Sequence, residues 1–406
     1  MSMSSDSHAD WSFYEKSGLT PVINVSGTMT SLGASIAVPQ AVEAVAGILP
    51  RFVSMHELQR MASDTITEAT GAEAGFITAS ASAGISLSIA ATITGMDAGR
   101  AELLPRRPGE KCEAVVQLGH LCNYGAPVGQ AAELAGARLV AFGQSTHVLD
   151  HQLEAALSDN TACGLYVVSH HVVEYGQMPL PRFAELCHAT GVPVIVDAAS
   201  EYDLRRFLRE GADLVIYSAH KFLGGPTAGI VAGRRDLVRA AYLQNLGIGR
   251  GMKVGKESIF GTIAALKAWA ARDHDGIRRR EAEALALWQK ALAGLAGVRA
   301  EIVPDPTGNP LDRLKISVDR EMAGASAMAI GVALAGERPA VIVRDHEAEL
   351  GYIQLDPCNL AAGHAEIVAD RLRAVFESAA QGAVEEPDPD QLRNRSAAGY
   401  LAWLEE

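Results

Sequence analysis

The sequence predicts an α/β protein whose larger domain is built on a mostly parallel sheet. Two observations predict this class. From about residue 74 to residue 234, short apolar runs alternate with helical segments, which is typical of βαβ units with helices on both faces of a sheet. From about residue 276 the pattern changes to a long charged helix and several short strands. We therefore expect an N-terminal segment at 1–20, a large domain at 21–275 and a small α+β domain at 276–406.

The elements of the large domain follow from apolar periodicity and turn residues. An expected strand at 22–28 precedes two helical segments, 37–49 and 56–71, the first with Pro39 near its start. The later apolar runs are expected strands, at 74–78, 113–118, 137–143, 163–169, 192–200 and 212–218. The segments between them are expected helices, at 85–95, 125–136, 147–157, 180–191 and 203–211. Residues 227–234 are expected to return as a hairpin-like strand.

The small domain is expected to open with a long amphipathic helix at 278–297. Short apolar runs then predict four strand segments, at 298–304, 313–319, 340–346 and 352–357. A late helix is expected at 364–380. The Pro- and Asp-rich stretch 382–396 is expected to be a linker to a short terminal helix at 396–406. Residues 1–10 are polar and expected to be mobile.

Composition excludes several classes of protein. The 406 residues are 48% hydrophobic and 20% charged, which is ordinary for a soluble globular chain. The net charge of −13 argues against binding to nucleic acid or to anionic membranes. Five cysteines without CxxC spacing predict neither a disulfide framework nor a metal site, and favour a reducing, cytoplasmic compartment. The N-terminus has no signal-peptide pattern, and no apolar stretch is long enough for a membrane span.

Lys221 stands at the end of an apolar strand and directly before the turn FLGGPTAG. A lysine that is partly desolvated at a strand end has a lowered pKa and acts as an amine nucleophile that forms a Schiff base with an aldehyde. Gly224 and Gly225 would let the backbone turn sharply beside it. The alternative is a surface lysine whose stem lies along apolar neighbours.

Two further features fall at strand ends, where ligands bind in doubly wound sheets. Asp197 ends the run VPVIVD and is the expected partner of a protonated pyridine nitrogen. A helix N-cap or a metal ligand would explain it as well. The stretch TASASAG at 78–84 would bring backbone N–H groups to a phosphate, with Ser80 and Ser82 adding hydroxyls. The alternative is a tight turn of small residues. Together with Lys221, these features predict a site for pyridoxal 5′-phosphate.

Several stretches also resemble a known family, namely VINVSGTMTSLG, GFITASASAGISLSIAA, VPVIVDAASE, IYSAHKFLGGPTAGIVAGRRDLV, MKVGKESIFGTIAAL and AVIVRDHEAELGYIQLDPCNL. They are similar to fold-type I pyridoxal-phosphate enzymes, the aspartate aminotransferase superfamily. Within it they resemble the branch of bacterial selenocysteine synthase and D-glucosaminate-6-phosphate ammonia-lyase. The resemblance implies a fold-type I large domain with a mostly parallel, seven-stranded type of sheet and a smaller α+β domain. It also implies a small-molecule substrate and a homodimer or higher homo-oligomer with shared active sites.

The resemblance assigns roles to the site residues. Lys221 would form the internal aldimine with the cofactor, and Asp197 would hold the pyridinium. The cofactor phosphate would meet Ser80, Ala81 and Ser82. Ser218 would bind the phosphate or orient the lysine, unless it only caps its own strand end.

The family pattern extends to residues in later and neighbouring segments. His120 would stack on the cofactor ring, although a loop histidine is commonly solvated or part of the core. Thr262 would reach the phosphate of a neighbouring subunit, unless it caps a helix. Arg344 would clamp a substrate carboxylate with its bidentate fork, or be an ordinary edge-strand arginine. Lys253 and Lys256 would bind an anionic substrate or merely flank a helix start.

The reaction is less constrained than the cofactor. Once the Cα proton of an amino acid is removed, elimination, racemisation and β-replacement are all open, with Lys221 as the proton carrier. The resemblance favours an ammonia-lyase that acts on a 2-amino-3-hydroxy acid, such as a sugar amino acid, and yields a 2-oxo acid. A racemase, epimerase or aldolase is the alternative. An acidic chain whose family pattern begins near Val22 disfavours a tRNA substrate, and the presence of both Lys221 and Asp197 disfavours a non-catalytic binding protein.

Overall fold

The computed structural model describes residues 11–404, which divide into two compact units. The larger unit comprises residues 33–272 and 306–309. The smaller unit comprises the described residues up to Leu32, residues 273–305 and those from 310 onward. The main segment of the larger unit ends at Arg272, and the chain continues into the smaller unit at Asp273.

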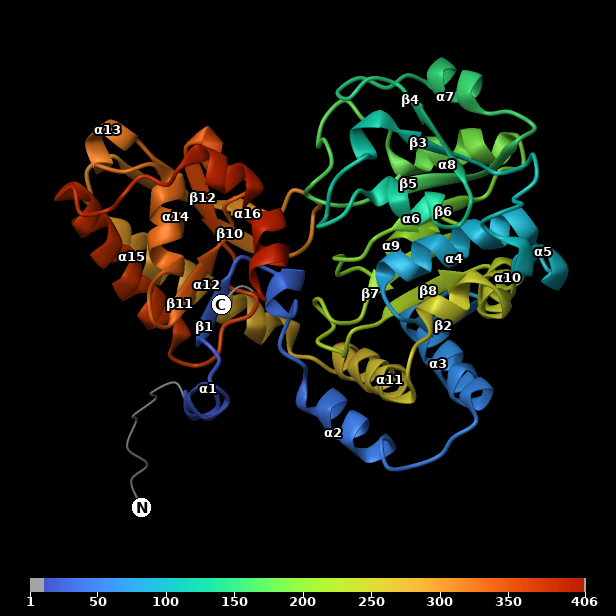
Figure 1. Cartoon of the computed structure of the whole chain (residues 1–406), viewed down its shortest axis with the longest axis horizontal. Helices are drawn as coiled ribbons and strands as arrows, with labels where there is room; N and C mark the ends of the chain where they lie inside the picture. Colours follow the sequence, from blue (N-terminus) through green and yellow to red (C-terminus); the bar gives the residue numbers. More distant parts are fainter. Residues whose placement is uncertain (1–10, 405–406) are drawn as a thin grey trace. The chain divides into compact units, whose positions relative to one another are not determined.

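The larger unit contains a seven-stranded sheet with the order β2-β8-β7-β6-β5-β3-β4, which can be followed by the labels in Figure 1. The strands are β2 (Ala74–Thr78), β3 (Glu113–Gln117), β4 (Arg138–Phe142), β5 (Thr161–Val167), β6 (Val194–Asp197), β7 (Leu214–Ser218) and β8 (Gly229–Gly233). β8 runs antiparallel to both of its neighbours, and the other neighbouring pairs are parallel. The predicted mostly parallel sheet and the predicted returning strand are confirmed.

Helices cover both faces of this sheet. The helices of the larger unit are α2 (Pro39–Ile48), α3 (Met55–Thr70), α4 (Ala81–Thr94), α5 (Ala98–Leu103), α6 (Val128–Glu133), α7 (Asp150–Ala156), α8 (Leu180–Ala189), α9 (Arg206–Arg209), α10 (Arg235–Leu243) and α11 (Lys256–Ala270). The 3₁₀ segments are η1 (Thr30–Leu32) in the smaller unit, and η2 (Leu118–His120), η3 (Gln244–Leu246) and η4 (Ile248–Met252).

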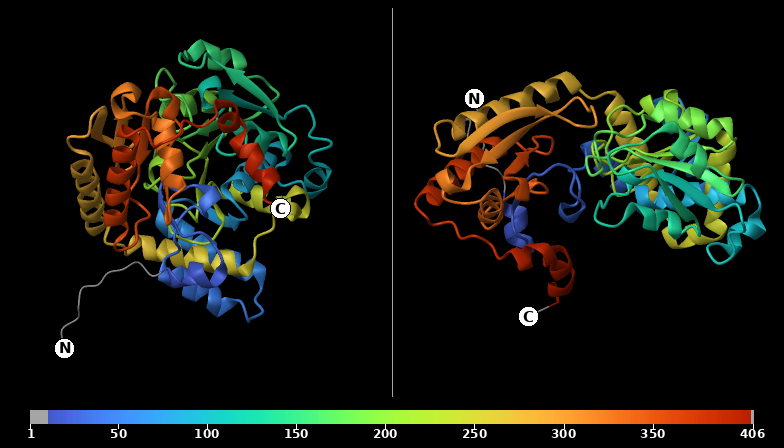
Figure 2. Two further views of the ribbon diagram at one scale, coloured as in Figure 1. Left: turned by 60° about the vertical axis from the view of Figure 1, so that its left-hand side comes forward. Right: turned by 90° about the horizontal axis from the view of Figure 1, so that it is seen from above.

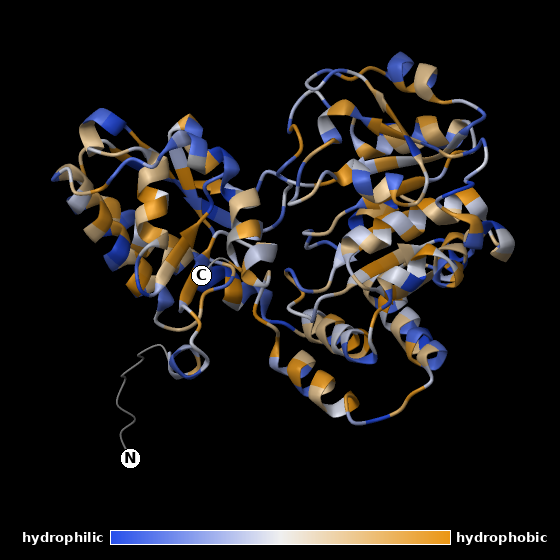
Figure 3. Cartoon of the chain, viewed as in Figure 1, coloured by the Kyte–Doolittle hydropathy of each residue, from blue (hydrophilic) through white to orange (hydrophobic). Residues whose placement is uncertain are grey.

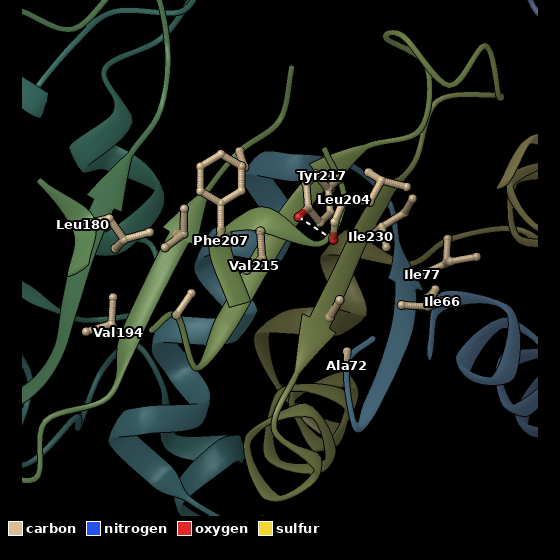
Figure 4. Packing of buried hydrophobic residues seen from close by; sticks show 14 of the residues in the cluster. Ile66, Ala72, Ile77, Leu180, Val194, Leu204, Phe207, Val215, Tyr217 and Ile230 are labelled. Carbon is tan, nitrogen blue, oxygen red and sulfur yellow. Dashed lines mark hydrogen bonds between the residues drawn. The ribbon is translucent and has the colours of Figure 1, made fainter. Parts of the chain in front are cut away.

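Alternate residues of each strand enter two separate apolar clusters, as the period of a strand requires. Val194 and Val196 pack with residues of α3, α8 and α11, whereas Ile195 packs with residues of α4, α6 and α10. Figure 4 shows part of the first cluster, where the buried Tyr217 hydroxyl donates a hydrogen bond to the Leu204 carbonyl at 3.0 Å. Because both faces are covered, the central strands β6 and β7 are apolar except at their carboxyl ends, and the strands of this sheet are mainly orange in Figure 3.

Helix α4 is buried along most of its length and lies directly on the sheet. A Cβ atom at Gly84 would be 2.9 Å from the Ile216 side chain, so only glycine permits this approach. The helix begins at Ala81 rather than at the expected residue 85, because the Ser80 side chain caps it.

The smaller unit has two sheets of its own. β1 (Val22–Val25) pairs in parallel with β11 (Ala340–Val343), and β10 (Asp312–Val318) lies between β9 (Val298–Pro304) and β12 (Tyr352–Leu355) in antiparallel order. Figure 2 shows α12 lying along the β9–β10 hairpin. The helical segments are α1 (Ser12–Ser17), α12 (His274–Leu292), α13 (Arg320–Ala323), α14 (Ala327–Ala335), η5 (Ala348–Leu350), α15 (His364–Ala380) and α16 (Pro389–Ala402).

Two expectations differ from this organisation. The strand β1 belongs to the smaller unit and not to the large domain, because its pairing partner β11 lies there. Helix α16 begins at Pro389, inside the expected linker, because the Asp388 side chain accepts a hydrogen bond from the Asp390 N–H and caps the helix. The expected mobile segment 1–10 lies outside the described residues. None of the helices within 11–404 has the length and apolar character that a membrane crossing requires.

Candidate active site

Asp197 and Lys221 lie at the carboxyl ends of the neighbouring strands β6 and β7. Asp197 is the last residue of β6, is 8% exposed and accepts one hydrogen bond at Oδ1 from the Ala199 N–H, at 3.2 Å. Burial raises the pKa of Asp197 to about 6, although the positive charge of Lys221 acts in the opposite direction. Burial lowers the pKa of Lys221, against the negative charges of Asp197 and Glu201.

The two groups therefore influence each other's charge without touching. No hydrogen bond or ion pair joins the side chains of Asp197 and Lys221 in the described part of the chain. A carboxylate and an amine held in this way are able to act on two different atoms of one ligand.

Lys221 is carried by a tight turn, residues 219–225, which we call the lysine turn. Gly224 has φ of +68° there, a left-handed conformation that favours glycine, and its N–H donates to the Lys221 carbonyl at 3.0 Å. The Gly225 N–H donates to the Ala219 carbonyl at 2.7 Å and closes the turn. The lysine position is thus set by the glycines that the sequence places after it.

Ser218 is buried directly before the lysine turn. Its Oγ lies 3.0 Å from Nδ1 of His220, so its side chain contacts the neighbour of Lys221. Burial and the adjacent Lys221 charge lower the pKa of His220, which keeps this ring neutral at pH 7. This contact is compatible with the lysine-orienting role expected for Ser218.

The N-terminus of α4 forms the third part of the site. The Ser80 Oγ accepts a hydrogen bond from the Ala83 N–H at 3.0 Å, and the Ser80 carbonyl accepts from the Gly84 N–H at 3.0 Å. Ala81 and Ser82 occupy the first two helical positions, whose N–H groups find no partner within an α-helix. These donors and the positive end of the helix dipole favour an anion at this point.

Gly229 on β8 brings the α4 N-terminus close to the sheet. A Cβ atom at Gly229 would lie 2.1 Å from the Ser80 carbonyl oxygen and 2.8 Å from the Ala81 nitrogen. The backbone at the start of α4 therefore packs directly against Gly229, and a larger residue would not fit there.

We expect that Gly229→Ala will displace the α4 N-terminus and destabilise the protein by about 3 kcal/mol, because a backbone clash cannot be relieved by a rotamer change. Urea unfolding measures this change. Gly251→Ala is the matched control, since a Cβ there would meet nothing within 4 Å, and it should unfold as the wild type does. Equal stability of the two variants would contradict the close packing of Ser80 on Gly229.

The loop that follows β3 adds two residues that sequence reasoning missed. The Tyr124 hydroxyl donates a hydrogen bond to the Ser82 Oγ at 3.0 Å. Burial raises the pKa of Tyr124, and burial together with the negative charge of Asp197 raises the pKa of Cys122 to about 11. Both groups stay protonated at neutral pH. The position of the loop after a strand was a signal, but the sequence does not tell which of its side chains points to Asp197.

Glu201 is a further residue that sequence reasoning missed. It is a carboxylate on the same turn as Asp197. It is 7% exposed, and its N–H donates to the Ala198 carbonyl at 3.2 Å. Asn309 holds this turn by donating to the Ser200 carbonyl at 3.2 Å and to Glu201 Oε1 at 3.4 Å. The Glu201 charge favours the protonated form of Lys221 and so raises the pKa of that amine.

The position of His120 differs from the expected stacking role. The side chain is 2% exposed, its Nδ1 accepts a hydrogen bond from the Val167 N–H at 3.1 Å, and its ring packs edge-on against Tyr166. Burial lowers the pKa of His120 to about 4, so the ring is neutral. A histidine enclosed in this way presents no open ring face to a cofactor.

Thr262 also differs from its expected role. It is completely buried on the inner side of α11, and its hydroxyl donates to the Ser258 carbonyl at 2.7 Å. A side chain without exposure does not reach a ligand in another subunit. Of the two lysines, Lys256 Nζ contacts the Arg51 carbonyl, and Lys253 is exposed just after η4.

Arg344 lies in the smaller unit at the end of β11. It is 5% exposed, and its backbone N–H and C=O both pair with Gln354 at 2.9 Å. Its Nη2 is 3.5 Å from Glu347 Oε1, while its Nε has no hydrogen-bond partner in the described structure. A buried guanidinium with an unsatisfied N–H has spare capacity for a ligand.

Solved structures with this arrangement identify the fold. The structure described as "Structure of D-Glucosaminate-6-phosphate Ammonia-lyase" is 36% identical, covers 91% of this chain and 99% of its own, and has a TM-score of 0.81. Aspartate aminotransferase from Thermus thermophilus is 13% identical, covers 89% of this chain and 94% of its own, and has a TM-score of 0.54. The chain has the fold-type I architecture of pyridoxal-phosphate enzymes, as the sequence predicted.

The family is equally clear. A family model described as "SelA: L-seryl-tRNA selenium transferase" matches residues 22–318, and the chain belongs to this family. D-glucosaminate-6-phosphate ammonia lyase of Salmonella typhimurium is 37% identical over 90% of this chain and 98% of its own length. The 5′-C-glycyluridine monooxygenase-decarboxylase of a Streptomyces species is 34% identical over 89% of this chain and 92% of its own length.

Proposed function

We propose that this chain is a pyridoxal-phosphate-dependent ammonia-lyase that converts a 2-amino-3-hydroxy acid of the sugar-acid type to a 2-oxo acid. The observation that carries the proposal is that Asp197 and Lys221 stand at the carboxyl ends of neighbouring strands of one sheet, while the N-terminus of α4 packs against β8 of the same sheet. The similarity to D-glucosaminate-6-phosphate ammonia lyase, which extends over nearly the whole of both chains, supports the choice of reaction.

The residues fit the cofactor. The N–H groups at the start of α4 and the Ser80 hydroxyl would hold the phosphate. Asp197 is a buried carboxylate whose charge is poorly compensated, so a protonated pyridine nitrogen would relieve its desolvation. The Lys221 amine would attach the aldehyde carbon. When bound, the cofactor withdraws electrons from the carbon that carries the substrate amino group, which makes loss of the Cα proton possible.

Lys221 is the proposed carrier of that proton. A general base has to be neutral, and burial lowers the pKa of Lys221 toward the working pH. Glu201 and Asp197 act in the opposite direction, so their charges limit the shift. In the net reaction the 3-hydroxyl leaves as water, one water is taken up, and ammonia is released with the 2-oxo acid.

Two sets of basic residues are proposed to recognise the substrate. Arg344 is proposed to bind the substrate carboxylate, because its buried Nε has no hydrogen-bond partner in the described structure. Lys253 is exposed and is proposed for a second anionic group of the substrate, such as a phosphate. Lys256 is a weaker candidate for this role, because its ammonium already contacts the Arg51 carbonyl.

We also propose that the chain is a cytoplasmic homodimer. Exposed apolar side chains gather on α2, on the segment after it and on α3, and they support the dimer: Val42, Leu49, Phe52, Val53, Met55 and Met61. Thr262 takes no part in the proposed shared site. Light scattering of the purified protein tests the dimer, since a monomeric mass would exclude it. The cytoplasmic location rests on the cysteine content and is tested by cell fractionation.

The reaction is tested by incubating the purified protein with D- and L-2-amino-3-hydroxy acids, D-glucosaminate 6-phosphate among them, in the presence of pyridoxal phosphate. We expect equal amounts of ammonia and 2-oxo acid from one enantiomer. Exchange of the Cα proton without ammonia would favour the racemase or epimerase, and cleavage to an aldehyde would favour the aldolase. Oxygen uptake with release of carbon dioxide would instead place the chain with its Streptomyces relative.

A further inference from the structure

The carbonyl groups of the lysine turn are bonded by side chains from distant parts of the larger unit. Ser35 Oγ lies 2.6 Å from the His220 carbonyl oxygen and 2.7 Å from that of Lys221. Arg272 donates from Nη1 to the Phe222 carbonyl at 2.8 Å and from Nη2 to the Leu223 carbonyl at 2.9 Å. Because the Ser35 hydroxyl has a single proton, it is shared between the His220 and Lys221 carbonyls, whereas Arg272 bonds both of its carbonyls at once. The two side chains together reach four successive peptide carbonyls around Lys221.

Ser35 belongs to a segment, 33–38, that packs against the lysine turn. The Val38 N–H donates to the Gly224 carbonyl at 2.8 Å, and a Cβ atom at Gly224 would be 2.9 Å from the Val38 side chain. Ala34, which directly precedes Ser35, has φ of +66° and is 1% exposed. Among residues 11–404 it is the one non-glycine residue with a positive φ. A strained backbone conformation of this kind persists only where the surrounding structure fixes it, and such conformations cluster at functional sites.

Arg272 is fixed by stacking as well as by hydrogen bonds. Its guanidinium carbon lies 4.7 Å from the centre of the Trp269 ring. The ring of Tyr202 packs against both Trp269 and Phe222, with centroid separations of 5.0 and 4.2 Å. A planar guanidinium held in this way presents its two terminal nitrogens to neighbouring carbonyls, which a lysine ammonium does not reproduce.

Both side chains stand where the chain enters or leaves the larger unit. The unit begins at Gly33, two residues before Ser35, and its main segment ends at Arg272. The segments that continue into the smaller unit are thus the same segments that hold the lysine turn.

We propose that Ser35 and Arg272 are positioning residues that set the lysine turn before any ligand arrives, so that Lys221 Nζ is aimed at the reacting carbon. The inference rests on the proposed function in so far as Lys221 is the attachment residue. The turn contains two successive glycines and would sample other conformations if its carbonyls were released. The hydrogen bonds from Ser35 and Arg272 to the carbonyls of the turn remove that freedom before binding, which is the general advantage of a preorganised site.

Hydrogen–deuterium exchange of the cofactor-free protein tests the positioning directly. In Ser35→Ala and Arg272→Ala we expect exchange of the peptides that cover 218–227 to be about tenfold faster, because a lost hydrogen bond changes a local opening equilibrium by roughly that factor. Arg205→Ala is the matched control, since Arg205 also donates to two carbonyls, those of Glu68 and Ala69, but away from the turn. Unchanged exchange at 218–227, or faster exchange throughout the protein, would overturn the proposal.

Trapping of the cofactor separates this inference from the proposed function. Borohydride reduction after a short incubation with pyridoxal phosphate, followed by peptide mass spectrometry, measures attachment to Lys221. We expect the rate of attachment to fall about tenfold in Ser35→Ala and Arg272→Ala, and to recover in Ser35→Thr, which keeps the hydroxyl, but not in Arg272→Lys. Wild-type protein that shows no adduct on Lys221 would refute the proposed function. An adduct that forms equally fast in all variants would refute only the positioning role.

Discussion

Replacing Lys221 by alanine is expected to abolish covalent attachment of pyridoxal phosphate and to lower the turnover by at least about 10³-fold. The expectation combines two losses, the amine that attaches the cofactor and the base that accepts the Cα proton, and the second alone contributes about 10² to 10⁴ in rate. Lys221→Arg should be equally inactive, because a guanidinium keeps its proton at every accessible pH. Absorbance of the bound cofactor and ammonia release measure the two losses separately.

Lys267→Ala provides the matched control for this experiment. Lys267 is exposed on α11 in the same unit and should give wild-type attachment and turnover when it is replaced. If Lys221→Ala still carried a borohydride-stable adduct on another lysine and released ammonia at the wild-type rate, the assignment of Lys221 would be wrong. Added methylamine is expected to restore part of the turnover of Lys221→Ala, since it replaces the missing amine without a covalent link to the chain.

The sheet and the centre of the site were predictable because their signals are local. The runs VIVD and LVIYS are apolar until they reach a polar last residue, since both faces of the sheet are covered and only the carboxyl ends of the strands meet the ligand edge. Asp197 and Lys221 could therefore be found from their place at the ends of such runs. The helix that follows TASASAG was found for the same reason, with an error of one turn at its start.

The features that sequence reasoning missed depend on contacts between distant residues. β1 was placed in the large domain because the pairing of Val22 with Ala340 leaves no trace in either strand. Ser35 acts on a carbonyl 186 residues away, and nothing around it resembles a motif. The sequence places His120 just after a predicted strand, which is why it is expected to face the ligand. It does not state the direction of the side chain, which the fold turns into the core. The start of α16 was missed because a Pro- and Asp-rich composition is typical of a linker, although Asp388 and Pro389 form an ordinary helix start.

Replacing Asp197 by asparagine is expected to lower the turnover by about 10²- to 10⁴-fold while leaving the protein folded. The amide oxygen can still accept the hydrogen bond from the Ala199 N–H, so the turn after β6 is retained. The variant loses the negative charge that would keep the pyridine nitrogen protonated, and with it most of the electron withdrawal from the substrate. Steady-state ammonia release at saturating cofactor measures the effect, and wild-type turnover in the variant would exclude a role for this carboxylate.

The same substitution is expected to make the cofactor-free protein more stable above about pH 7. Burial raises the pKa of Asp197 from 3.8 to about 6, so its contribution to stability is complete below 3.8 and is lost as the pH rises through about 6. Removing the ionisable group should therefore raise the free energy of unfolding by up to about 3 kcal/mol at neutral pH, at 1.36 kcal/mol per pKa unit. In acid it should change the free energy of unfolding by nothing from this source. Urea unfolding across this range measures the difference, and Asp64→Asn, an exposed change on α3, should follow the wild type. Pyridoxal phosphate should then stabilise the wild type more than Asp197→Asn, because only the carboxylate gains a counter-charge. If the cofactor-free wild type were more stable than Asp197→Asn at neutral pH, the burial cost assigned to Asp197 would be wrong.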